Sequence, residues 1–104
     1  MDQIVVLALL RAQTGKSEEL GERLSALVTT SRLEEGALLY DIHHSLEDPD
    51  LWMVYEIYRS KEDFDAHIQS PPLRAFAADF PALLDGGLDI KTFKMISTPA
   101  PLRP

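Results

Sequence analysis

Residues 40–73, YDIHHSLEDPDLWMVYEIYRSKEDFDAHIQSPPL, hold the pattern that decides the fold. Two runs of strand-forming residues, Ala37 to Ser45 and Leu51 to Arg59, lie on either side of the sequence Glu-Asp-Pro-Asp at 47–50. Proline fixes φ in such a turn, and acidic side chains accept local backbone hydrogen bonds. The stretch therefore predicts a hairpin of two antiparallel strands.

A helical region is predicted directly after this hairpin. Ser60 can cap a helix, with Asp63 as its capping-box partner three residues later. The helix restarts at Ser70-Pro71, because proline is tolerated at the first helical position but not inside a helix. Pro81 and then Gly86-Gly87 are expected to close the region. Helical spacing turns one set of side chains inward, namely Phe64, His67, Ile68, Leu73, Phe76, Ala77 and Phe80.

Outward from these elements, both ends of the chain predict further strands. Ile4 to Leu10 is an unbroken apolar run, which indicates a strand covered on both faces. A helix is expected from about Ser17 to Leu33, and Gly36 is suited to the left-handed cap that ends it. Leu88 to Ser97 predicts a fourth strand. The apolar stripe of the first helix consists of Leu20, Leu24, Leu27 and Val28.

The order strand, helix, strand, strand, helix, strand predicts an α+β domain on the ferredoxin-like βαββαβ plan, with a four-stranded antiparallel sheet. Residues 1–97 are expected to form this single domain, and residues 98–104 a Pro-rich C-terminal tail that cannot continue a ladder. Right-handed crossovers place both helices on one face of the sheet. The other face needs a cover, so we expect a homodimer, a dimeric α+β barrel with sheets inside and helices outside.

Composition excludes several kinds of partner and chemistry. The net charge is −7 and no cluster of Lys or Arg is present, which argues against a nucleic-acid partner. The chain has no cysteine, so it has no disulfide, thiolate nucleophile or sulfur-bound metal, and this fits a reducing, cytoplasmic location. The apolar run near the N-terminus is too short for a membrane span and lacks the basic flank of a signal peptide.

Residues 40–73 also hold the side chains best suited to chemistry, including every histidine and tyrosine of the chain. His67 is the candidate catalytic base, because an interior histidine can titrate near neutral pH. The alternative is a core histidine hydrogen-bonded to a neighbour. Glu56 is the second candidate catalytic residue, able to orient His67 or to act as a base with a pKa raised by burial. Its alternative is a structural carboxylate, paired for example with Arg74.

Aromatic residues near this pair predict a pocket wall for a planar ligand, although each is also an ordinary core residue type. The predicted substrate-binding residues are Trp52, Tyr58, Tyr40, His44, Phe64 and Phe76. No metal site is predicted, because His43 and His44 point to opposite faces of a strand and no ligand pair has the helical HExxH spacing. The sequence contains no glycine-rich phosphate loop of the kind that binds a flavin or nicotinamide, so no cofactor is expected.

Residues 31–76 resemble the antibiotic biosynthesis monooxygenase family of dimeric α+β barrels. The matching features, in order, are E-x-G at 34–36, Y-D-I-H at 40–43, E-D-P-D at 47–50, Y-E at 55–56, A-H-x-x-S at 66–70 and L-R-A-F at 73–76. The resemblance extends over residues 4–97. The chain departs from the usual family pattern at Tyr58, where tryptophan is common, and at Trp52, where smaller or phenyl side chains are frequent.

The resemblance implies a cofactor-independent monooxygenase that acts on a quinol or polyphenolic aromatic substrate with dioxygen, and in which His67 removes the phenolic proton. Other members isomerise a phospho-sugar signal or degrade haem. The haem-degrading branch fits poorly, because its histidine corresponds to Ala77 and its first-strand asparagine is missing from Ile4 to Leu10. Two alternatives stay open: isomerisation of a small hydroxy-carbonyl compound, and a non-catalytic ligand-binding dimer.

Overall fold

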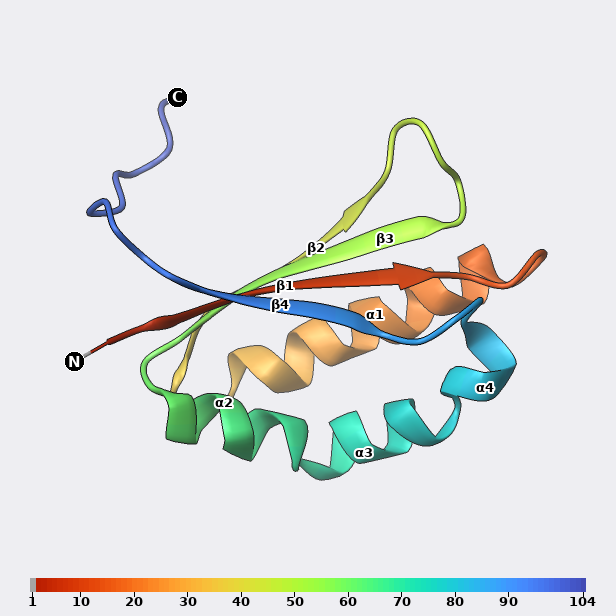
Figure 1. Cartoon of the computed structure of the whole chain (residues 1–104), viewed down its shortest axis with the longest axis horizontal. Helices are drawn as coiled ribbons and strands as arrows, with labels where there is room; N and C mark the ends of the chain where they lie inside the picture. The colour runs from red at the N-terminus through yellow and green to blue at the C-terminus, as the bar shows by residue number, and fades with distance from the viewer. Residues whose placement is uncertain (1) are drawn as a thin grey trace.

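A four-stranded antiparallel sheet carries the helices on one face and leaves the other face open (Figure 1). The computed structural model describes residues 2–104, so Met1, with which the predicted domain begins, lies outside the described residues. In chain order the elements are β1 (Ile4–Arg11), α1 (Ser17–Arg32), β2 (Ala37–His44), β3 (Leu51–Tyr58), α2 (Lys61–Ile68), α3 (Pro71–Ala78), α4 (Phe80–Leu83) and β4 (Asp89–Lys94). The strand order β2-β3-β1-β4 confirms the predicted α+β, ferredoxin-like fold.

The register of the central strand β3 places Glu56 beside Tyr40 on one face of the sheet. Glu56 of β3 lies opposite Val6 of β1 and Tyr40 of β2. Residues that lie opposite each other on neighbouring strands point to the same face. Because side chains alternate along a strand, Val54 and Tyr58 also share this face with Glu56. This is the face that the helices cover.

The core between sheet and helices is built by the predicted stripes. Leu20, Leu24 and Leu27 of α1 are buried there, and Val28 packs against them. Full burial of one such leucine contributes roughly 1.5–3 kcal/mol relative to an exposed position, so this stripe holds α1 on the sheet. The sheet and the later helices contribute Ala8, Leu10, Val54, Phe76 and Leu83.

The end of α1 differs from the expectation. The helix stops at Arg32, and its cap residue Leu33 has right-handed helical φ and ψ. Gly36 is not in the left-handed region, so the predicted glycine cap is wrong. Gly36 is required for space instead, because a Cβ at this position would stand 2.2 Å from Cγ of Asp63 in α2.

The second helical region divides into α2 and α3 as predicted and then continues further than predicted. Ser60 caps α2 by accepting a hydrogen bond from the backbone N–H of Asp63, and α3 begins at Pro71. Pro81 does not close the region but lies in the first turn of α4, where proline has no needed N–H to lose. Ala77, expected to face inward, is exposed on α3.

No helix among the described residues covers the second face of the sheet. Register and alternation place apolar side chains of all four strands on this open face: Val5, Leu7, Leu9, Leu39, Met53, Tyr55, Ile57 and Phe93. β4 is shorter than the predicted Leu88 to Ser97, and its six residues are all exposed. Residues 98–104 have no regular structure and run on the side away from the helices (Figure 1). None of the helices between residues 2 and 104 is long and apolar enough to cross a membrane.

Candidate active site

A cavity of about 50 Å³ lies between the helix-covered face of the sheet and helices α1, α2 and α3. Leucine, valine and phenylalanine side chains make up most of its wall, and Phe64 and Phe76 are among them. The polar residues of the wall are Tyr40, Glu56 and His67. The cavity therefore brings together five of the predicted site residues, from β2, β3, α2 and α3.

The mouth of this cavity is marked by its exposed lining residues. Ile68 at the end of α2 is 42% exposed and Ile90 of β4 is 39% exposed, whereas Glu56, His67 and Phe76 are buried. These two residues, one at the end of α2 and one in β4, are where the lining of the cavity meets solvent.

Glu56 and Tyr58 are paired on β3. The Tyr58 hydroxyl donates a hydrogen bond of 2.6 Å to Oε1 of Glu56. Burial raises the pKa of Glu56 to about 7, although the hydrogen bond from Tyr58 acts in the opposite direction. Burial and the Glu56 charge both raise the pKa of Tyr58, which keeps the phenol protonated as a donor. The alternative partner Arg74 is exposed on α3.

His67 lies in the last turn of α2, turned inward as predicted and 3% exposed. Its Nδ1 is 3.0 Å from Oε1 and 3.1 Å from Oε2 of Glu34, a residue of the loop between α1 and β2. Its Nε2 is 3.7 Å from Oε1 of Glu56, which is too long for a hydrogen bond. Burial lowers the pKa of His67, and the Glu34 carboxylate opposes this effect.

Glu34 is the site residue that the sequence reasoning missed. Glu56 was expected either to orient His67 or to act as a base itself; the carboxylate that contacts the imidazole at hydrogen-bond distance is Glu34. The only signal in the sequence was its place in the E-x-G motif at 34–36, which was interpreted as a helix end. The two partners are separated by 33 positions, so local spacing could not join them.

Tyr40 packs directly against the imidazole, with ring centroids 5.4 Å apart. The Tyr58 ring lies 5.1 Å from the same imidazole and 5.2 Å from the ring of Phe64. Burial raises the pKa of Tyr40, and the nearby Glu56 charge adds to this effect. His67 is therefore enclosed by aromatic rings on the side of the sheet and by a carboxylate on the side of the loop.

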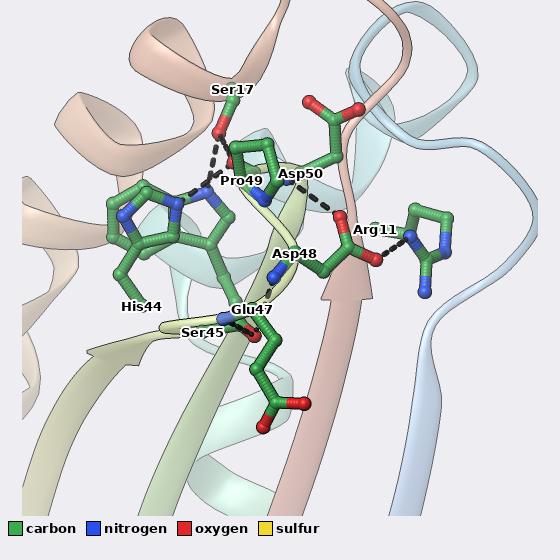
Figure 2. Close-up of polar contacts among 9 residues, drawn as sticks. Arg11, Ser17, His44, Ser45, Glu47, Asp48, Pro49 and Asp50 are labelled. Carbon is green, nitrogen blue, oxygen red and sulfur yellow. Dashed lines mark hydrogen bonds and ion pairs between the residues drawn. The ribbon is translucent and has the colours of Figure 1, made fainter.

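Trp52 and His44 lie elsewhere, outside the cavity and beside the start of α1. Their rings stack with centroids 4.0 Å apart and an interplanar angle of 6°. Nε1 of Trp52 donates to the Ser17 hydroxyl at 3.0 Å, and that hydroxyl donates to the carbonyl of Pro49. Nε2 of His44 also lies 2.8 Å from the Pro49 carbonyl, to which it can only donate. Figure 2 shows Ser17 and His44 meeting Pro49 at the hairpin.

The hairpin turn itself has the predicted chemistry (Figure 2). Oδ1 of Asp48 accepts the N–H of Asp50, and the Ser45 hydroxyl accepts the N–H of Asp48. Asp48 also forms an ion pair with Arg11 at the end of β1. The ion pair of Asp48 with Arg11 holds the hairpin to β1, and the hydrogen bond of Trp52 to Ser17 holds it to α1. The cluster is therefore a structural joint between the hairpin and these two elements.

The sequence profile of the antibiotic biosynthesis monooxygenase family matches residues 3–79. The chain belongs to this family. Among its relatives, Rv0793 of Mycobacterium tuberculosis is 30% identical over 81 residues, which are 78% of this chain and 79% of that protein. It is named provisionally as a monooxygenase. The protein sll1783 of Synechocystis is 27% identical over 97 residues, and the match spans 93% of this chain but 66% of that protein.

The fold is shared with a solved structure. The crystal structure of PA3566 from Pseudomonas aeruginosa superposes with a TM-score of 0.88 at 28% identity. The superposition covers 93% of this chain and 97% of that chain. The two chains therefore share the βαββαβ architecture described above.

The cavity holds a buried imidazole and a buried carboxyl whose pKa values are shifted in opposite directions. Burial lowers the pKa of His67, which favours the neutral imidazole, and raises the pKa of Glu56 to about 7, which favours the protonated carboxyl. One side chain can accept a proton and the other can donate one. Within residues 2–104, no three His, Asp or Glu side chains gather where they could hold a metal ion. His43, weighed as a ligand, is exposed at the edge strand β2.

Proposed function

We propose that the protein is a cofactor-independent monooxygenase that oxidises a neutral quinol or polyphenol with dioxygen. The observation that carries this proposal is the position of His67, whose Nε2 lies at the polar end of an otherwise apolar cavity. The family assignment and the relative named as a monooxygenase support the same reaction class. His67 is the proposed base.

The proposed reaction needs no outside reductant. Nε2 of His67 takes the phenolic proton, and the resulting phenolate transfers electrons to dioxygen. One oxygen atom forms a bond to a ring carbon, and the other leaves as water with hydrogen from the substrate. A quinol and dioxygen thus give a hydroxylated quinone and water. The chain contributes orientation, removal of water and a proton acceptor.

The charge of the cavity favours a neutral substrate. No lysine or arginine is among the described residues that line it, and Glu56 is the one acid there. A phosphate or carboxylate group would meet no cation and would approach Glu34 and Glu56. This supports a quinol or polyphenol over a phosphorylated sugar.

The size of the cavity requires the mouth to widen when the substrate binds. A volume of about 50 Å³ holds a few water molecules, or dioxygen, but no aromatic ring. The exposed side chains of Ile68 and Ile90 are the ones free to move outward. The substrate ring can therefore occupy the widened mouth with its hydroxyl directed towards Nε2 of His67, and dioxygen the space that remains.

A second candidate reaction is the isomerisation of a small unphosphorylated hydroxy-carbonyl compound. The observation that favours it is the pairing of an acid and a base, since Oε1 of Glu56 lies 3.7 Å from Nε2 of His67. Enolisation needs a base at a C–H bond and an acid at the carbonyl oxygen. It consumes no dioxygen, which separates the two reactions by experiment.

We also propose that two chains associate through their open sheet faces. Support comes from the apolar side chains that β1, β2, β3 and β4 leave without cover, of which Phe93 is 49% exposed. Burying an apolar surface of this kind is favourable in proportion to its area. A face-to-face dimer keeps the helices outside and leaves each cavity within its own chain.

Oxygen uptake by the metal-stripped protein, measured against a panel of quinols and polyphenols, tests the proposed function. His67→Ala is expected to lower the rate about 10²- to 10⁴-fold, the usual contribution of a general base. His43→Ala is the matched control, because this histidine is exposed and lies outside the cavity. Uptake that does not depend on His67 would refute the assignment. Proton exchange on hydroxy-carbonyl compounds without oxygen uptake would identify the isomerase instead.

A further inference from the structure

The closest polar contact of His67, the buried histidine of the cavity, is with Glu34. Both oxygens of the Glu34 carboxylate lie within hydrogen-bond distance of Nδ1, at 3.0 and 3.1 Å. The contact joins the loop after α1 to the last turn of α2. It fixes the ring from the side opposite to Glu56, because Glu56 lies nearest to the other ring nitrogen, Nε2.

The chemistry of this contact determines which nitrogen carries the proton. A carboxylate only accepts hydrogen bonds, so Nδ1 of His67 must donate to Glu34. In a neutral imidazole the other nitrogen, Nε2, then holds the lone pair. Oε1 of Glu56 is 3.7 Å from Nε2, beyond hydrogen-bond distance, so this lone pair is free.

The two carboxyl groups beside His67 differ in their access to water. The Glu34 side chain is 28% exposed, whereas that of Glu56 is 7% exposed. A charge in contact with water costs much less than a buried charge. The Glu34 carboxylate therefore keeps its contact with water beside the imidazole, while burial raises the pKa of the Glu56 carboxyl.

We propose that Glu34 is the positioning residue of the site: it holds His67 as the Nδ1–H tautomer, presents the Nε2 lone pair to the cavity, and stabilises the imidazolium once Nε2 has taken a proton. The part about catalysis rests on the proposed function, whereas the part about the tautomer does not. Glu34 acts through His67 and is not itself among the residues that line the cavity.

A titration of His67 must account for all ionisable groups that face it. These are Glu34 from the loop after α1, Tyr40 from β2, and Glu56 and Tyr58 from β3. Only Glu34 is within hydrogen-bond distance of the ring. Replacement of Glu34 should therefore change the imidazole far more than replacement of any other acid nearby.

The test is imidazole nitrogen NMR of the whole chain without substrate, in the wild type, Glu34→Gln and Glu35→Gln. Glu35 is the matched control, because it is the adjacent acid and contacts Arg59 instead of His67. We expect Nδ1–H in the wild type and in Glu35→Gln. In Glu34→Gln the amide can donate or accept, so both tautomers should appear and the pKa of His67 should fall. An Nε2–H tautomer in the wild type would overturn the proposal without any variant.

Oxygen uptake then separates this inference from the proposed function. If the wild type consumes oxygen with a quinol, Glu34→Gln should lower kcat about tenfold or more with little change in KM, as for other carboxylates that orient a catalytic histidine. An unchanged tautomer and pKa in Glu34→Gln would refute the role of Glu34 at any level of activity. An altered tautomer in a protein without oxygen uptake would retain Glu34 as the positioning residue and refute the monooxygenase.

Discussion

Tyr58 donates a 2.6 Å hydrogen bond to Glu56, two residues before it on the same face of β3. This bond favours the ionised carboxylate, and burial favours the protonated one. Burial prevails, because the pKa of Glu56 is raised to about 7. The Tyr58 hydroxyl therefore limits how far burial raises the pKa of Glu56.

Removing this phenol should raise the pKa of Glu56 further. In Tyr58→Phe the carboxylate loses the one hydrogen-bond donor that it has among residues 2–104 but stays buried, so the pKa is expected to move above its present value of about 7. Carbon NMR of the labelled carboxyl, followed against pH, measures the change. Tyr55→Phe, on the open face of the same strand, is the control and should leave the titration unaltered. A lower pKa in Tyr58→Phe would mean that the phenol does not stabilise the ionised carboxylate.

The raised pKa of Glu56 also predicts a dependence of stability on pH. The folded protein holds this proton up to about pH 7, whereas the unfolded chain releases it near 4.5. Glu56 thus stabilises the fold below pH 4.5, and this contribution is lost as the pH rises from 4.5 through 7. The loss is on the order of 3 kcal/mol, from 1.36 kcal/mol for each pKa unit.

Comparison with Glu56→Gln isolates this effect, because the depressed pKa of His67 acts in the opposite direction over the same pH range. Urea denaturation should show that Glu56→Gln gains stability relative to the wild type between pH 4.5 and 7.5. Parallel stability curves for the two proteins would mean that Glu56 does not titrate in this window.

Gly21 of α1 should be essential for the joint between α1 and the hairpin. A Cβ at this position would stand 2.6 Å from Cη2 of Trp52. Gly21→Ala is therefore expected to displace the indole from His44 and to cost about 1–3 kcal/mol, the usual penalty of overpacking. Fluorescence of the single tryptophan and the Tm report the change. Gly87→Ala, where a Cβ meets no atom within 4 Å, should be silent in both measurements.

A charge on the open face should separate the proposed dimer. Met53 is half-buried in the centre of β3 and faces away from the helices. Met53→Arg is expected to shift the sedimentation coefficient to that of a monomer at micromolar concentration, because an unpaired cation is costly to bury at an interface. Ala26→Arg, on the exposed side of α1, should sediment as the wild type does. A wild type that sediments as a well-folded monomer would contradict the dimer itself.

The sequence predicted the architecture well because the fold depends on local periodicity. The stripe of α1, the cap at Ser60, the new helix at Pro71 and the facing of His67 all follow from spacing within one element. Alternation along β3 likewise placed Glu56 on the same face as Val54 and Tyr58. These features need no knowledge of which elements meet.

Contacts between distant elements were harder to predict. Alternation along a strand shows to which face a side chain points, but not which element lies over it. Trp52 was therefore grouped with Glu56, although its indole contacts Ser17 at the start of α1. Glu34 lies in a loop, which has no periodicity, and its partner is 33 residues away. The grouping of the candidate residues was thus predictable where it depends on one helix and one strand, and unpredictable where it depends on a loop.

The exposed residue at the edge of the cavity and the proposed catalytic base are neighbours in the sequence. Ile68 is the exposed residue at the mouth, and His67 is the residue before it in the last turn of α2. Under the proposed function, a substrate ring that displaces Ile68 would therefore act on the same helical turn that carries the proposed base. The fit of the substrate and the alignment of the imidazole would then depend on each other.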